Sequence, residues 1–257
     1  MNKYVKPAAC FIALFGLYHA AEYFIVFKNN SIAFLLLQVL FFITAWLLGK
    51  WYAHNGLRAW ALPFNKKAVY NILPGVLMGL ILYAVPYFFN LLTGIEKVTS
   101  APGFAQIMSS AIPFAFGVLL SSFSEDILTR GILFAAMDEK NKGVLFIVLS
   151  SAIYLLNHIY RLTDGPAAWS YIFLLGVVLA IPLMFTRTLW FTGGMHWAGN
   201  VFFFTSHNTI QTTTAANALI APNYVFALYM LLFIPFIWAV SRRLAHKQNI
   251  NGKQYIE

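Results

Sequence analysis

Two adjacent acids and an arginine, Glu125, Asp126 and Arg130, lie inside an apolar stretch of the sequence. The flanking residues 116–120 and 132–136 are apolar enough to belong in a lipid bilayer. Ionisable side chains at membrane depth are costly to insert, so those that are present usually serve a function. The group is therefore a candidate for acid–base chemistry, and a buried charge network that fixes helix packing is the structural alternative.

The spacing of these residues on a helix separates the roles of the two acids. Asp126 and Arg130 are four residues apart with the acid first, which is the favourable order for an ion pair. Glu125 and Arg130 are five apart, which is about 140° around a helix of 3.6 residues per turn. We therefore expect Arg130 to neutralise Asp126 and Glu125 to face other partners.

Two later apolar blocks each carry a histidine with a second functional side chain one helical turn away. Tyr154 and His158 form one such pair, and His196 and Asn200 form the other. Taken alone, a histidine near a span end is usually packed or interfacial, and a His–Asn pair serves equally well in helix–helix hydrogen bonding. Together with Glu125 they offer one carboxylate, two imidazoles and one carboxamide on three segments that can face one another.

Apolar blocks of membrane-spanning length must position these side chains. Hydrophobic residues make up 60% of the 257 and charged residues only 10%, against about 25% charged in a soluble domain. Strand-type alternation, which a membrane β-barrel needs, is absent. We predict an all-α polytopic membrane bundle in which residues 1–257 form a single integral membrane domain. The expected spans are 7–27, 31–48, 69–92, 104–137, 143–160, 168–185, 189–205 and 224–240.

Two features of these blocks bear on the geometry of the site. The block at 104–137 exceeds the roughly 20 residues that a span needs. It is either one span entered through an interfacial helix broken near Pro113, or a re-entrant piece followed by a span. In the block at 189–205, His196 is expected to lie shallower than Glu125 unless tilt or extra length compensates. The glycines of that block, Gly193, Gly194 and Gly199, should let a neighbouring helix approach closely.

The distribution of charge predicts the topology. The net charge of +9 reflects topology and anionic headgroups rather than nucleic acid, because the basic residues lie between apolar blocks. With the N-terminus inside, the outer segments hold only Lys28, Lys97 and Arg161, Arg130 is intramembrane, and every other Lys and Arg falls on the inner side. This bias predicts eight transmembrane helices with both termini in the cytoplasm. The single cysteine, Cys10, excludes an intramolecular disulfide.

The three motifs, in this order, resemble those of the C-a-a-X (CAAX) endopeptidase and bacteriocin-processing family (CPBP, Abi) of intramembrane proteases. The family pattern is Glu-Glu-x-x-x-Arg, Phe-x-x-x-His and His-x-x-x-Asn/Asp, and the resemblance covers roughly residues 104–206. Here Asp126 replaces the second Glu and still reaches an arginine four residues on. Tyr154 replaces Phe and adds a hydroxyl that can hydrogen-bond near the site.

The resemblance implies a glutamate-dependent endopeptidase, integral to the bacterial cytoplasmic membrane. Glu125 would be the general base that activates a water, and His158 would help to hold that water. His196 and Asn200 would donate hydrogen bonds to the developing oxyanion. The pair of Asp126 and Arg130 would support the site by orienting the helix that carries Glu125.

The expected partners are the lipid bilayer and a peptide or protein substrate, without nucleic acid and without a cofactor. Two histidines and a glutamate can also hold zinc with an open position. However, the sequence contains no H-E-x-x-H motif, and the resemblance implies a metal-free mechanism. Loss of activity to a chelator, restored by zinc, would favour the metal site.

A non-catalytic membrane protein is the competing hypothesis, either a bacteriocin immunity or scaffold protein or a small solute or proton transporter. In a transporter, His19 and Glu22 would be continuous with Glu125, and the two histidines of the later motifs would not cluster. Hydrolysis requires the opposite arrangement, with Glu125, His158, His196 and Asn200 around one pocket.

Overall fold

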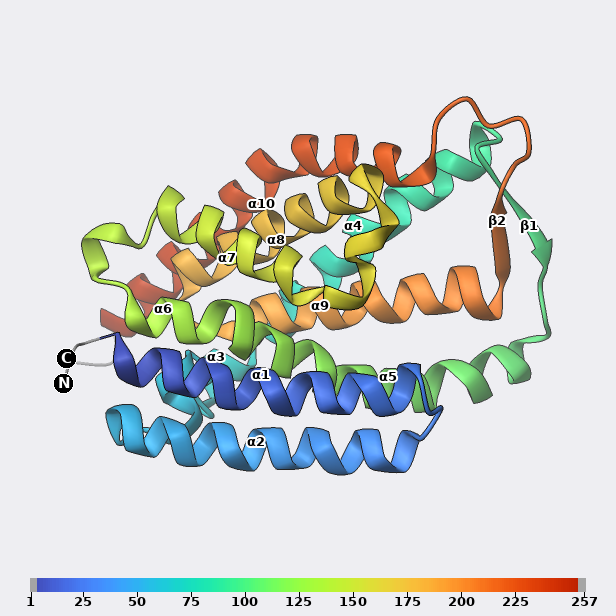
Figure 1. Cartoon of the computed structure of the whole chain (residues 1–257). Helices are drawn as coiled ribbons and strands as arrows, with labels where there is room; N and C mark the ends of the chain where they lie inside the picture. Colours follow the sequence, from blue (N-terminus) through green and yellow to red (C-terminus); the bar gives the residue numbers. More distant parts are fainter. Residues whose placement is uncertain (1–3, 254–257) are drawn as a thin grey trace.

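The computed structural model describes residues 4–253, and helices make up most of that range (Figure 1). The α-helices are α1 (Val5–Val26), α2 (Ser31–Ala53), α3 (Lys66–Val69), α4 (Ile72–Leu92), α5 (Phe104–Asp126), α6 (Ile132–Ala136), α7 (Val144–Asn157), α8 (Pro166–Thr186), α9 (Leu189–Phe203) and α10 (Pro222–Lys253). Short 3-10 helices are η1 (Gly56–Trp60), η3 (Glu139–Asn141) and η4 (Ile159–Asp164), and π-helical turns are η2 (Ile127–Gly131) and η5 (Phe204–Thr209). The predicted all-α bundle is confirmed.

Within the described residues, six helical segments are long and apolar enough to cross a membrane. They are Val5–Val26, Ser31–Ala53, Ile72–Leu92, Phe104–Ala136, Pro166–Thr186 and Pro222–Lys247. The prediction of a multi-pass integral membrane protein is confirmed. The predicted fifth and seventh spans correspond to α7 and α9, which have only 14 and 15 residues. The count of eight and the cytoplasmic termini stay predictions, although α1 begins and α10 ends at the same end of the bundle (Figure 1).

Local sequence accounts for where several helices begin. The Asn30 side chain accepts a hydrogen bond from the Ala33 backbone N–H at 2.9 Å and caps α2. The Thr188 hydroxyl accepts from the Trp190 backbone N–H at the start of α9. Pro166 opens α8, where its missing N–H removes no helical hydrogen bond.

The long fourth block is one helical run built from α5, η2 and α6. Pro113 lies inside α5 without ending it, so the break expected there and the re-entrant alternative are both wrong. The irregularity falls instead at the π-helical turn directly after the two acids. The Ser150 hydroxyl of α7 donates to the Thr129 carbonyl oxygen of this turn at 3.2 Å. Such turns are frequent at functional sites.

Glycines let α4 and α9 pack closely. An added Cβ at Gly79 of α4 would lie 2.2 Å from the Met195 carbonyl oxygen, and one at Gly194 of α9 would lie 2.6 Å from the Ile72 carbonyl oxygen. No side chain larger than hydrogen fits at these positions. The close approach predicted from the glycines of this block is confirmed, and it fixes the part of α9 that carries His196.

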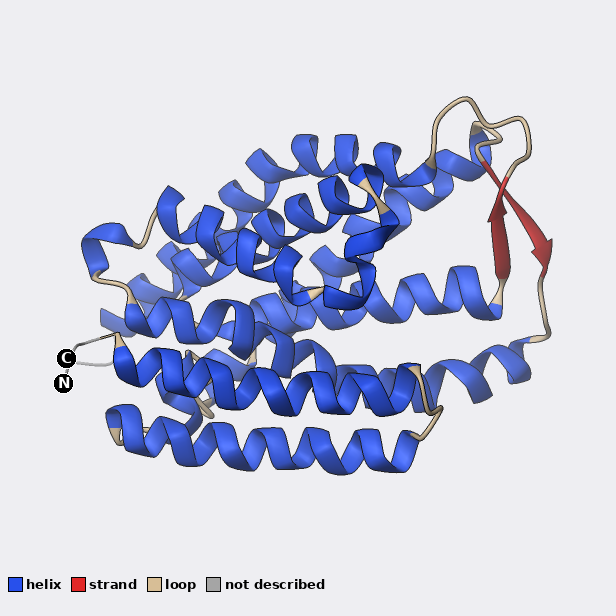
Figure 2. Ribbon diagram, in the orientation of Figure 1, coloured by secondary structure: helices blue, strands red, loops and turns tan. Residues whose placement is uncertain are grey.

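Two short strands, which the sequence did not predict, lie at one end of the bundle (Figure 2). Strands β1 (Glu96–Ser100) and β2 (Gln211–Thr214) pair antiparallel, with Glu96 opposite Thr214 and Val98 opposite Thr212. They join the segment that follows α4 to the segment that follows η5. The end of α4 and the end of α9 are thereby held together.

Candidate functional site

Glu125 lies at the C-terminal end of α5 with only 7% of its surface exposed. Its Oε1 accepts a hydrogen bond from Asn157 Nδ2 at 3.1 Å and lies 3.8 Å from His158 Nδ1. Its Oε2 lies 3.7 Å from His196 Nε2. The carboxylate therefore has one imidazole on each side, supplied by the end of α7 and by α9.

His158 is the residue that caps α7, which ends at Asn157 instead of continuing to residue 160 as predicted. Its Nδ1 lies 2.8 Å from the Tyr154 carbonyl oxygen, and its ring packs edge-on against the Tyr154 ring at 4.7 Å between centroids. Because a carbonyl oxygen only accepts, Nδ1 carries the hydrogen. The neutral ring therefore keeps the lone pair of Nε2 for another partner.

His196 lies between the two carboxylates and is 3% exposed. Its Nδ1 is 3.3 Å from Asp126 Oδ1, while its Nε2 faces Glu125. A carboxylate likewise only accepts, so Nδ1 carries the hydrogen here as well. Nε2 is an acceptor in the neutral ring and a donor in the imidazolium.

The expected difference in depth between His196 and Glu125 does not separate the two side chains. Helix α9 begins inside the packed part of the bundle, where its first residue, Leu189, is fully buried. The Leu189 backbone N–H donates to the Ala61 carbonyl oxygen at 2.8 Å. This start, together with the close packing on α4, brings His196 to the level of Glu125.

Asp126 and Arg130 form the ion pair that their spacing predicts, and both side chains are fully buried. Arg130 Nη1 donates to Asp126 Oδ1, and also to Thr129 Oγ1 at 3.0 Å. The guanidinium lies over the Tyr154 ring at 4.6 Å from its centroid, a cation–π contact. Asp126 has a second partner that the spacing did not predict, because it also holds His196.

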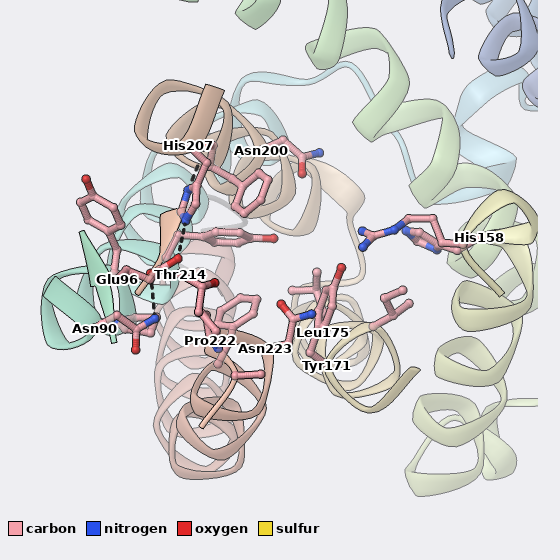
Figure 3. A pocket seen from close by; sticks show the side chains of 18 of the residues that line it. Asn90, Glu96, His158, Tyr171, Leu175, Asn200, His207, Thr214, Pro222 and Asn223 are labelled. Carbon is pink, nitrogen blue, oxygen red and sulfur yellow. Dashed lines mark hydrogen bonds and ion pairs between the residues drawn. The ribbon is translucent and has the colours of Figure 1, made fainter. Parts of the chain in front are cut away.

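Asn200 lies one turn after His196 on α9. Its Nδ2 donates to the Ser122 hydroxyl at 3.2 Å, one turn before Glu125 on α5. Together with Tyr154 and His158, Asn200 lines a cavity of about 590 Å³ (Figure 3). Of the four residues predicted around one pocket, His158 and Asn200 line this cavity, whereas Glu125 and His196 are not among its lining residues.

A second polar cluster lines the same cavity on the side away from His158 (Figure 3). Asn90 Nδ2 donates to Glu96 Oε2 at 2.9 Å, and His207 Nε2 lies 3.2 Å from Glu96 Oε1. Burial raises the pKa of the Glu96 carboxyl, but the hydrogen bonds from His207 and Asn90 outweigh it, so this pKa lies below its ordinary value. No spacing rule predicts this cluster, because its members come from three separate elements, α4, β1 and η5.

Two residues that contact Glu125 were not assigned a role from the sequence. Asn157 precedes His158 and is a lone carboxamide in an apolar helix, a signal that could have identified it. Tyr18 of α1 also lies close enough to the Glu125 carboxylate for the two side chains to interact electrostatically. A tyrosine in an apolar span carries no comparable signal.

The residues expected to extend a transport path lie in a different arrangement. His19 Nδ1 and Glu22 Oε2 pair with each other at 2.9 Å. Glu22 lines a second, mostly apolar cavity of about 570 Å³ between α1, α2 and α5, which Tyr18 also lines. Over residues 4–253, no group of three or more His, Cys, Asp and Glu side chains has an arrangement that could hold a metal ion.

Comparison with known proteins identifies the segment that carries the site. Residues 107–202 match the family model described as type II CAAX prenyl endopeptidase Rce1-like. Comparisons with curated proteins and with solved structures gave no match. The matched segment runs from α5 to α9 and contains Glu125, His158, His196 and Asn200. The predicted resemblance to the CAAX endopeptidase family is thereby confirmed over residues 107–202.

Proposed function

We propose that this protein is an intramembrane endopeptidase of the bacterial cytoplasmic membrane, which hydrolyses a peptide bond with a water that Glu125 activates. The observation that carries the proposal is the pair of imidazoles, His158 and His196, on either side of the buried Glu125 carboxylate. The match of residues 107–202 to the CAAX endopeptidase family supports it. So does the adjoining cavity, whose volume suits a ligand of a few residues.

In the first step, the Glu125 carboxylate takes a proton from the attacking water. The hydrogen bond from Asn157 occupies Oε1, which leaves Oε2 to accept that proton. Nε2 of His158 accepts the second hydrogen of the same water and orients it. The water oxygen then bonds to the carbonyl carbon of the scissile peptide, and the carbonyl oxygen becomes an oxyanion.

His196 and Asn200 supply the hydrogen bonds that stabilise this oxyanion. Because Asp126 already accepts the Nδ1 hydrogen of His196, the ring donates at Nε2 only as an imidazolium. Asn200 turns its Nδ2 from the Ser122 hydroxyl toward the same oxygen. Fixed donors in a buried site stabilise developing charge far more than they would in water.

In the last step, Glu125 returns its proton to the nitrogen of the leaving amine. The carbon–nitrogen bond breaks as the oxyanion becomes a carbonyl again, and the products are a carboxylic acid, which keeps the second hydrogen of the water, and a free amine. The carboxylate of Glu125 is regenerated, so the residue serves first as base and then as acid. No covalent intermediate with the protein is required.

Glu125→Gln tests this mechanism because it retains the size of the side chain and removes the base. Wild type and variant are purified in detergent and incubated with a defined library of synthetic peptides, and new peptide termini are counted by mass spectrometry. We expect the variant to lose activity by about 10²-fold to 10⁴-fold, the usual contribution of a general base. Glu22→Gln is the matched control and should keep its activity. Equal hydrolysis by wild type and Glu125→Gln would refute the mechanism.

A further inference from the structure

Arg161 is a charged side chain in the cavity that the proposed hydrolysis does not use. It lines the cavity together with His158 and Tyr171. The carboxylate in the same lining, Glu96, already has a partner on each oxygen. Arg161 is therefore the fixed charge of this lining that is available to a ligand.

A 3-10 turn holds Arg161 at a set distance from His158. The Arg161 backbone N–H donates to the His158 carbonyl oxygen at 2.9 Å, and the turn continues as η4. At about 2 Å of rise per residue, the two residues are about 6 Å apart along the axis. An extended peptide covers that distance in about two residues.

The guanidinium of Arg161 is held in orientation by its neighbours, but not all of its N–H donors are used. Its Nε donates to Asp164 Oδ2 at 3.0 Å, and the guanidinium lies over the Tyr171 ring at 5.6 Å from its centroid, a cation–π contact. A guanidinium carries five N–H donors, so its terminal nitrogens keep donors for a ligand. The side chain is 47% exposed, which makes these donors accessible from the cavity.

We propose that Arg161, oriented by Asp164 and Tyr171, binds a carboxylate that the substrate carries about two residues from the scissile bond. The proposal rests on the proposed hydrolysis and names a property of its substrate. A guanidinium and a carboxylate form two parallel hydrogen bonds, which fix direction as well as position. This contact would hold the peptide with its scissile bond at Glu125. The carboxylate is either the C-terminus of the peptide or an acidic side chain.

A binding experiment distinguishes these two sources. Three libraries share the same apolar sequences: free C-terminal acids, C-terminal amides, and amides with one Glu at each position in turn. Each is passed over immobilised Glu125→Gln protein in detergent, and retained peptides are quantified by mass spectrometry. We expect acids, or amides with Glu at one position, to be retained about tenfold better than plain amides. The class retained identifies the source of the carboxylate.

The variants connect this preference to Arg161. In the Glu125→Gln background, Arg161→Gln should abolish the preference for carboxylates. Arg161→Lys should leave part of it, because lysine keeps the positive charge but cannot form the two parallel hydrogen bonds of a guanidinium. Arg187→Gln is the matched control, since Arg187 is similarly exposed and pairs with Glu139 outside the cavity. Equal retention of all three libraries by the Glu125→Gln protein would overturn the proposal, and this comparison does not depend on the folding of any Arg161 variant.

Failure of the subsite and failure of hydrolysis give different results. If the Glu125→Gln protein prefers carboxylates but wild type cleaves no peptide, the subsite stands and the hydrolysis proposal falls. If wild type cleaves all three libraries equally, the hydrolysis proposal stands and the subsite falls. A preference that survives Arg161→Gln, with the variant folded by gel filtration, would also refute the role of Arg161.

Discussion

At the residue scale, the chemistry depends on which ring nitrogen each histidine presents to Glu125 and its substrate. His158 and His196 both have Nδ1 against an oxygen that only accepts, a carbonyl for His158 and a carboxylate for His196. When neutral, both rings therefore keep the lone pair on Nε2. That nitrogen faces Glu125 in His196, whereas the His158 nitrogen nearer to Glu125 is Nδ1. His196 has a carboxylate near each nitrogen, Asp126 at Nδ1 and Glu125 at Nε2, so both N–H groups of its imidazolium would have an acceptor. The nearest acceptor to His158 is the Tyr154 carbonyl oxygen at Nδ1. We infer that His196 acts as the donor and His158 as the acceptor.

Asn157 should matter to catalysis because it holds Oε1 of the general base. Asn157→Ala removes a hydrogen bond to a charged group, which is worth about 1.5–3 kcal/mol. We expect kcat to fall by roughly tenfold to a hundredfold, with KM little changed. Steady-state kinetics on a cleaved peptide measures both quantities. Asn217→Ala, in an exposed loop, is the control, and an unaltered kcat in Asn157→Ala would show that Oε1 needs no fixed partner.

The buried pair of Asp126 and Arg130 makes a prediction about stability. Arg130→Met leaves the Asp126 carboxylate buried without its cation, which should cost about 3–5 kcal/mol of the free energy of unfolding. Adding Asp126→Asn removes the stranded charge and should recover much of that loss. The double variant should stay inactive, because the carboxylate that accepts from His196 is gone. Thermal unfolding in detergent and peptide hydrolysis test the two parts, and a double variant no more stable than Arg130→Met would contradict the charge argument.

At the scale of elements, the site is positioned by close backbone contacts between helices, which glycines make possible. Helix α9 carries His196 and Asn200, the two donors proposed for the oxyanion, and its distance from α4 is set by glycines at the contact. Helix α5 carries Glu125, the proposed base, and continues directly into the π-helical turn η2. The Thr129 hydroxyl of that turn donates back to the Glu125 carbonyl oxygen at 2.8 Å. The backbone around Glu125 is thus held from both its own turn and α7.

Gly79→Ala tests whether this packing positions His196. Its Cβ would lie 2.2 Å from the Met195 carbonyl oxygen, so α9 must move. A displacement of about 1 Å can cost about a hundredfold in rate, and we expect a loss of that order together with a lower Tm. Gly16→Ala is the matched control, because an added Cβ there meets nothing within 4 Å. Equal activity of the two variants would mean that α9 is positioned by other contacts.

The sequence predicted the elements that depend on composition and missed those that depend on contacts. Apolar blocks predicted the long helices, and spacing predicted the ion pair of Asp126 and Arg130. The π-helical turns and the pair β1–β2 were missed because their hydrogen bonds join distant segments or alter a regular helix locally. In the site, the motifs identified Glu125 and both histidines. The contact of Tyr18 with Glu125 was not predictable, because no spacing rule relates α1 to α5.

At the scale of the whole molecule, one cavity connects two polar clusters of different kinds. One side holds His158, which lies beside Glu125, and the other holds the ion pair of Glu96 and His207 beside the strands. The second cluster joins the end of α4, β1 and η5, which converge where the cavity meets the strand end of the bundle. Breaking this cluster should therefore lower the stability of the whole bundle, in addition to any effect on the chemistry.

The lowered pKa of Glu96 predicts how the stability of the bundle changes with pH. A carboxyl whose pKa is lower in the folded state stabilises the fold above its unfolded pKa, about 4.5. That stabilisation is lost as the pH falls through the lower, folded value. The groups that face this carboxylate are His207 and Asn90, and both contact its oxygens, so protonation of Glu96 weakens these contacts.

The measurement is the Tm in detergent of wild type and Glu96→Gln, from neutral pH to well below 4.5. We expect wild type to melt at the higher temperature above that pH and the two curves to converge below it. Glu139→Gln is the matched control, because the Glu139 pKa is also lowered, by hydrogen bonds from Lys142 and Arg187. Glu139 is exposed, so its replacement should shift Tm little at any pH. A difference between wild type and Glu96→Gln that widens in acid would contradict the ionised pair.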